Sequence, residues 1–165
     1  MNGSGIKNRT KRNLNGVRNK KKNTRKRNKT IIKKKLGENK PKTDAIRMMV
    51  RMFMEMLVVV KLYHWKTMDL SIHLASDDLY KSLNNHIDRF VELLIGKTGH
   101  SINNVCISCF SLDTKHHFIE AINGYIQYLR GLNRVLDSHK DSELITIRDE
   151  MIGDFIQLIY LIRLK

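Results

Sequence analysis

Hydrophobic residues recur three and four positions apart along four stretches of the chain, a spacing typical of helices with one buried face. We predict helices over about residues 44–67, 69–95, 113–137 and 140–163, with Gly96 ending the second. Residues 97–112 separate the second helix from the third, and sixteen residues can stretch roughly 50 Å. We therefore predict an all-α fold, a four-helix bundle over residues 44–165 with one long crossover.

The first quarter of the chain lacks this pattern and is strongly basic. Residues 1–43 contain 17 Lys and Arg and one acid, Glu38, whereas the remainder is nearly neutral. We predict residues 1–43 to be a disordered polybasic tail that binds DNA, or RNA, without sequence preference by releasing counterions. A nuclear address or a solvating tail are the alternatives. The basic runs are Lys20, Lys21, Lys22, Arg25, Lys26, Arg27, Lys33, Lys34 and Lys35.

The hydropathy pattern indicates a protein outside membranes. The N-terminus has no apolar core typical of a signal peptide, and no uncharged run is long enough to span a bilayer. We expect a soluble, intracellular protein with no membrane partner.

The second predicted helix carries two pairs of metal-ligating side chains. His73 and Asp77 are four residues apart, as are Asp88 and Glu92, so each pair shares a helix face. The fifteen residues from His73 to Asp88 correspond to roughly 22 Å of helix, too far for one ion. A second copy packed antiparallel across a two-fold axis would bring opposite pairs together and form two identical mixed sites.

These residues resemble a known family. His64 and Trp65, followed by His73, Asp77 and the Asp88-x-x-x-Glu92 pair, are similar to the ferroxidase signature of Dps, the DNA-protection-during-starvation branch of the ferritin-like proteins. The opening around His64 is closest to that of Dps-like proteins of large DNA viruses. The gap from His64 to His73 is nine residues, about one helical turn shorter than in typical Dps.

The resemblance implies a ferritin-like bundle that binds iron, at a di-iron or mono-iron site, and oxidises Fe(II) with peroxide or oxygen. His64, His73, Asp77, Asp88 and Glu92 would then be metal ligands and catalytic residues, and Zn or Mn are alternative ions. It also implies a homo-oligomer, a dodecamer built on two-fold dimers, that stores the ferric product. The compartment would be a virion or the host cytoplasm or nucleus for a viral protein, and the nucleoid for a cellular one.

A second function from another class stays open. The chain could be a non-enzymatic nucleic-acid-packaging protein on a ferritin-like scaffold, with a structural or vestigial metal site. The sequence has no Glu-x-x-His pair of the kind that binds two iron ions inside a bundle, which favours a site between subunits. Cys106 and Cys109 are expected to be reduced thiols, with zinc or redox roles as alternatives. His86 has no partner that the sequence identifies.

Overall fold

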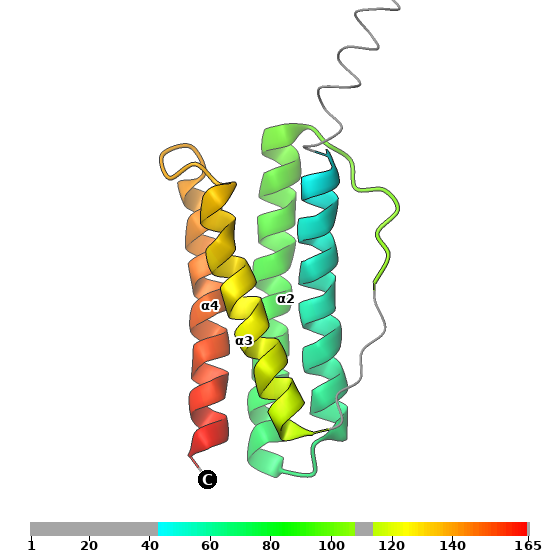
Figure 1. The fold of residues 1–165 in the computed structure, drawn as a ribbon, viewed down its shortest axis with the longest axis vertical. Helices are drawn as coiled ribbons and strands as arrows, with labels where there is room; N and C mark the ends of the chain where they lie inside the picture. Colours follow the sequence, from blue (N-terminus) through cyan, green and yellow to red (C-terminus); the bar gives the residue numbers. More distant parts are fainter. Residues whose placement is uncertain (1–42, 108–113, 165) are drawn as a thin grey trace, which may run out of the picture. The chain divides into compact units, whose positions relative to one another are not determined.

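The structure, a computed structural model, describes residues 43–107 and 114–164 (Figure 1). Residue contacts divide the chain into two compact units, Met1–Asp44 and Ala45–Lys165. Almost all of the described residues belong to the second unit, which is the one considered below. The polybasic segment predicted to be disordered and to bind nucleic acid lies outside the described residues, as does Cys109.

The described part of the chain is all-helical, as predicted, and contains no strand. A first helix covers residues 43–66, and three further α-helices and a short 3-10 helix follow it. These elements are α2 (Leu70–Thr98), α3 (Lys115–Gly131), η1 (Leu132–Arg134) and α4 (Ser142–Arg163). In Figure 1, α2 and α3 run in one direction, while the first helix and α4 run in the opposite direction.

Aromatic side chains from all four helices occupy the core. Phe53, Phe90, Phe118 and Phe155 have no exposed surface. The rings of Phe53 and Phe90 meet edge to face with centroids 5.1 Å apart, which joins the first helix to α2. Tyr63 stacks on Phe118 at 3.8 Å and joins the first helix to α3. The apolar positions that predicted the four helices therefore supply a shared core.

The two ends of α2 are capped in different ways. At its start, the Asp69 side chain accepts hydrogen bonds from the backbone N–H groups of Ser71 and Ile72, as an N-cap does. At its end, the prediction that Gly96 terminates the helix is wrong, because α2 continues to Thr98. Gly99 is the terminating residue: its φ of 66° is left-handed, and its N–H donates to the Ile95 carbonyl at 2.7 Å.

The C-terminal end of α2 is tied to the start of α4 by one lysine. The Lys97 ammonium lies 2.9 Å from an Asp141 carboxylate oxygen and 2.5 Å from one of Glu143. It also donates to the Lys140 carbonyl. Lys97 lowers the pKa values of both carboxyls, and they in turn raise the pKa of Lys97. This cluster aligns α2 and α4 at one end of the bundle.

The third and fourth helices are shorter than predicted. The third α-helix ends at Gly131, and the chain tightens into η1 before the turn that leads to α4. Leu132 and Leu136 nevertheless stay buried, as their apolar pattern predicts.

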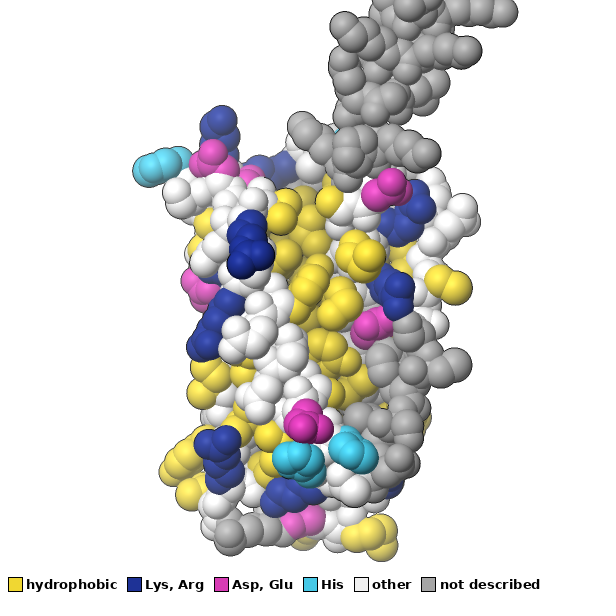
Figure 2. All heavy atoms as spheres, viewed as in Figure 1, with side chains coloured by type: hydrophobic (Ala, Val, Ile, Leu, Met, Phe, Trp, Pro, Cys, Tyr) yellow, Lys and Arg dark blue, Asp and Glu magenta, His cyan; other side chains and the backbone are white. Residues whose placement is uncertain are grey.

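One face of the bundle is markedly apolar. Figure 2 shows hydrophobic side chains in a continuous band between α3 and the first helix, with charged side chains on either side. Within the described residues, no helix is both long and apolar enough to cross a membrane.

Candidate metal centre

The candidate centre is built around two histidines where the first helix turns into α2. His64 lies in the last turn of the first helix, and His73 in the first turn of α2. The two rings stack with centroids 3.8 Å apart and planes inclined by 29°. His64 Nδ1 lies 3.0 Å from the His73 carbonyl oxygen, and His73 Nδ1 lies 2.9 Å from the His64 carbonyl oxygen.

These reciprocal contacts determine which ring nitrogens can bind a metal. A carbonyl oxygen only accepts hydrogen bonds, so each Nδ1 must carry the hydrogen and donate it. In the neutral ring, Nε2 then keeps its lone pair, which is the form that ligates metal ions. The His64 carbonyl is in the last helical turn, where carbonyls lack intrahelical partners, so His73 also satisfies the end of the first helix.

The Ser76 hydroxyl contacts both residues of the histidine pair. It is fully buried, and its hydroxyl donates to the His73 carbonyl at 3.0 Å. The Ser76 hydroxyl oxygen also lies 3.4 Å from His64 Nδ1, where it can accept part of the hydrogen bond that this nitrogen donates. His64 is itself buried, with 7% of its surface exposed, whereas His73 is only partly buried. His64 is therefore the more firmly held of the two rings.

Asp77 is the third member of this group. One of its oxygens lies 4.0 Å from His64 Nε2. Its carboxylate also meets the ammonium groups of Lys81 at 2.8 Å and Lys61 at 3.4 Å. The hydrogen bond from Lys81, helped by Lys61, holds the pKa of Asp77 below its usual value. Asp77 is therefore ionised and close to the histidine pair, and any arriving cation would compete with two lysines for it.

Asp88 and Glu92, the other predicted ligands, lie far from this group within one chain. Both are exposed on α2, about 22 Å and 28 Å along the helix axis from His73. At about 100° per residue, His73, Asp77, Asp88 and Glu92 nevertheless fall within roughly 100° of one another around the axis. Among the described residues, no three His, Cys, Asp or Glu side chains come together to hold one ion. One chain thus presents two separated halves of a ligand set on one helix face.

The surface around the histidine pair is unusually apolar. Trp65, Met68, Leu70 and Leu74 are exposed by 68%, 99%, 71% and 56%, respectively. Lys61 lies over the ring of Trp65 at 5.8 Å and over that of Tyr80 at 4.7 Å. Large apolar side chains gathered on a surface are typical of interaction sites. We refer to Trp65, Met68, Leu70 and Leu74 as the turn patch.

The structure also shows a cluster that the sequence did not reveal. His86 on α2 lies between two carboxylates of α4, with Nδ1 3.4 Å from Glu150 and Nε2 3.3 Å from Asp154. The i, i+4 spacing of Glu150 and Asp154 is visible in the sequence, but the pairing of α2 with α4 that brings them to His86 is not. Cys106 is an exposed free thiol, and the Cys-x-x-Cys prediction stays a prediction because Cys109 is outside the described residues.

Comparison with known proteins finds a family that this chain matches. Residues 64–162 match a family of unknown function, DUF5856. The chain belongs to this family. The DUF5856 region begins at His64 and contains all five predicted ligands, the turn patch, α2, α3, and α4 except for its last residue. No curated protein and no solved structure matches the chain.

Proposed function

We propose that this protein is a Dps-like ferroxidase that pairs across a two-fold axis and binds nucleic acid through its basic N-terminal segment. The observation that carries the proposal is the His64–His73 pair. Both Nδ1 atoms are engaged by backbone carbonyls, which leaves both Nε2 atoms for Fe(II). Asp77 beside them supplies a carboxylate, and mixed imidazole and carboxylate ligands suit Fe(II).

The separation of the two ligand groups supports a site shared between two chains. In an antiparallel pair of α2 helices, the histidine end of one helix faces the Asp88 and Glu92 end of the other. The turn patch supplies apolar surface for such contact, because Met68 is almost wholly exposed in one chain and Leu70 is largely exposed. Each site would then hold His64, His73 and Asp77 of one subunit against Asp88 and Glu92 of the other.

The reaction at such a site is the oxidation of Fe(II), which is the substrate. Two Fe(II) ions each give up one electron, and hydrogen peroxide accepts both electrons and two protons to become two water molecules. Carboxylates offset the higher charge of the Fe(III) product. Asp88 and Glu92 would otherwise repel each other weakly at their i, i+4 spacing, so cation binding relieves them. The ferric product would be stored in a hollow dodecamer built from the two-fold dimers.

The helix directions support a ferritin-like topology. Because α2 and α3 run in the same direction, the chain between them must return along the bundle (Figure 1). One long crossover between the second and third helices is the ferritin-like arrangement. This crossover includes residues 108–113, which are outside the described residues, so its course belongs to the proposal.

The basic segment supplies the nucleic-acid contact. Residues 1–43, with 17 basic residues and one acid, account for the whole positive excess behind the net charge of +15. Many such segments on one particle raise the effective concentration and convert weak phosphate contacts into tight binding. DNA held on the particle would be protected from the iron and peroxide that the centre consumes.

One observation favours the alternative, a non-enzymatic packaging protein with a structural or vestigial metal site. Asp77 is already neutralised by Lys81 and Lys61. If these ion pairs persist when iron is present, the carboxylate stays unavailable and the histidine pair serves only to join the first helix to α2. Nucleic-acid binding would then be the whole function.

Iron binding separates the two functions. Anaerobic Fe(II) titration followed by peroxide should show stoichiometric binding and rapid oxidation by the parent protein, both lost in a His64→Ala, Asp88→Ala double variant. His116→Ala, Glu120→Ala is a matched control, because this exposed pair on α3 also joins an imidazole to a carboxylate, at 3.2 Å. Equal binding and oxidation by the parent and the first variant would refute the ferroxidase and leave the packaging function.

Deletion of residues 1–43 tests the nucleic-acid contact. We expect the shortened chain to assemble normally but to lose retention of duplex DNA in a gel-shift titration, and the parent's affinity to fall steeply with added salt. A shortened particle that still shifts DNA at moderate salt would show that another surface binds it.

A further inference from the structure

The His86 cluster lies on the opposite side of α2 from the candidate iron centre. His86 follows Asp77 by nine residues, which is two and a half helical turns, so the two side chains leave the helix about half a turn apart. His86 faces α4, where Glu150 and Asp154 approach its two ring nitrogens at 3.4 and 3.3 Å. The cluster is therefore independent of His64, His73 and Asp77.

A neutral imidazole cannot satisfy both of these carboxylates. It carries one N–H donor, and its second nitrogen only accepts, so that nitrogen and a carboxylate oxygen would face each other with no hydrogen between them. The Asp154 Oδ2 atom, the one nearest Nε2, is buried and accepts no hydrogen bond from any described residue. A buried carboxylate oxygen without a partner is costly, and either a hydrogen on the ring nitrogen or a bound metal ion between the two atoms would remove that cost.

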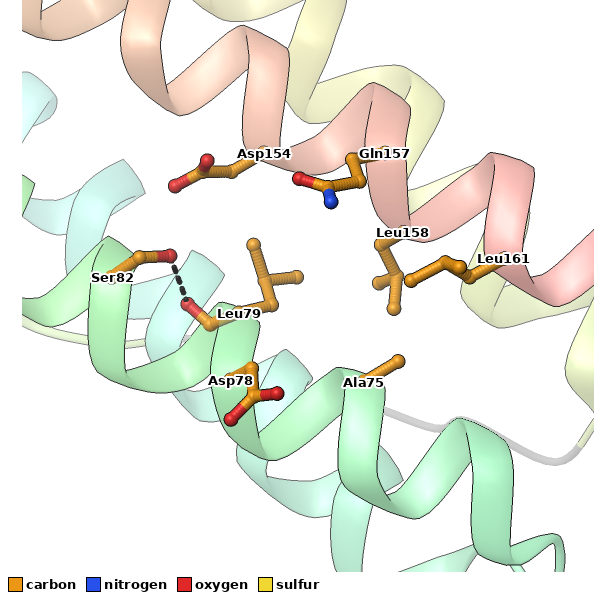
Figure 3. A pocket seen from close by; sticks show the side chains of 8 residues that line it. All are labelled: Ala75, Asp78, Leu79, Ser82, Asp154, Gln157, Leu158 and Leu161. Carbon is orange, nitrogen blue, oxygen red and sulfur yellow. Dashed lines mark hydrogen bonds between the residues drawn. The ribbon is translucent and has the colours of Figure 1, made fainter.

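A cavity lies beside Asp154. It has a volume of about 250 Å³ and lies between α2 and α4. Figure 3 shows Asp154 and Gln157 reaching from α4 toward α2, with Ser82 of α2 opposite Asp154. The volume is large enough for several water molecules as well as an ion. Asp154 thus borders both the His86 ring and a space that solvent can fill.

We propose that His86 and Asp154 bind a divalent transition-metal ion, of the Zn²⁺ class, at the edge of this cavity. His86 Nε2 and Asp154 Oδ2 are the two protein ligands, and water in the cavity completes the coordination. Glu150 accepts a hydrogen bond from His86 Nδ1–H and so holds the ring with Nε2 toward the metal. The ion links α2 to α4 and stabilises their packing.

The distances fit this assignment. With ligand bonds of about 2.0–2.1 Å and tetrahedral angles, two ligand atoms on one zinc ion are roughly 3.3–3.4 Å apart. His86 Nε2 and Asp154 Oδ2 are 3.3 Å apart. A carboxylate on the far nitrogen of a ligating histidine is a recurrent arrangement that fixes its tautomer, and Glu150 occupies that position. Two protein ligands give weaker binding than the four of a structural zinc site.

Zinc titration of the full-length protein tests the proposal. The parent for this experiment is a His64→Ala, His73→Ala, Cys106→Ser, Cys109→Ser variant, so that neither the candidate iron centre nor the two thiols can contribute to Zn²⁺ binding. We expect one Zn²⁺ per chain by calorimetry, a rise in melting temperature with added Zn²⁺, and a Zn²⁺-dependent shift of the His86 Nε2 resonance in ¹⁵N NMR. Each readout is independent of iron oxidation, so the result stands whether or not the protein is a ferroxidase.

Variants that preserve packing locate the ion. His86→Gln and Asp154→Asn should each abolish Zn²⁺ binding and the metal-induced rise in melting temperature, and Glu150→Gln should weaken binding by about 10- to 100-fold. Asp149→Asn is the matched control, because this carboxylate neighbours Glu150 but pairs with Arg148 at 2.7 Å. No binding by the parent, or undiminished binding by His86→Gln and Asp154→Asn when both remain folded, would overturn the proposal.

Discussion

Replacing His64 by alanine should cost more stability than replacing His73, although both changes should abolish metal binding. His64→Ala removes a buried ring, the stacking on His73, and the hydrogen bond from Nδ1 to the His73 carbonyl. The stack and the hydrogen bond contribute about 0.5–1.5 kcal/mol each, and the cavity left in the turn adds to both. We expect a loss of roughly 2–4 kcal/mol.

His73→Ala loses the same stack and its own hydrogen bond, but its partly exposed ring leaves a space that water can enter. Ser76 and His64 still satisfy the His73 carbonyl, since that group belongs to the backbone. The expected loss is about 1–2 kcal/mol. Urea denaturation of metal-free protein, with unchanged slope in denaturant, measures both values. Equal losses of stability, or no loss for His64→Ala, would refute the stacked arrangement in which each ring donates a hydrogen bond to the other residue's carbonyl.

Two further predictions concern the ends of α2. Gly96→Ala should stabilise the protein by about 0.5–1 kcal/mol, because Gly96 is within the helix and an added Cβ meets no atom within 4 Å. Gly99→Ala should destabilise it by about 1–2 kcal/mol, because the φ of Gly99 is 66°. Thermal unfolding of both variants measures the contrast, and a change of the same sign for both would contradict it. Lys97→Met should reduce the loss of stability in acid. The pKa values of Asp141 and Glu143 are lowered in the folded protein, so these ion pairs stabilise the fold at pH values above the usual pKa values of 3.8 and 4.5. That stabilisation disappears as the pH falls below those values. Unfolding curves between pH 7 and pH 3 test this, and parallel pH profiles for parent and variant would count against the ion pairs.

The sequence predicted the helices well because their signal is local. Apolar residues three or four positions apart lie on one face of a helix, and that face is buried. Phe118 and Phe155, which follow this spacing, are in the core. The end of α2 was misplaced because two glycines, Gly96 and Gly99, lie three residues apart. The sequence does not show which of them takes the left-handed conformation.

The candidate site was predictable only in part. The spacing of His73 and Asp77 is a local signal, whereas the crossed carbonyl contacts of His64 and His73 depend on how the turn folds. The His86 cluster joins α2 to residues of α4 more than sixty positions later, and no pattern in the chain specifies that pairing. Spacing reveals which side chains share a face, but not which face another helix covers.

The most direct test of a site shared between subunits is complementation between two inactive variants. His73→Ala and Asp88→Ala damage opposite halves of the ligand set, so neither homodimer contains an intact site. A dimer of one chain of each has one intact site of two. Unfolding and refolding an equal mixture should therefore restore about one quarter of the parent's anaerobic Fe(II) binding and peroxide-driven oxidation. No recovery above the separate variants, although mixed dimers form, would contradict the shared site.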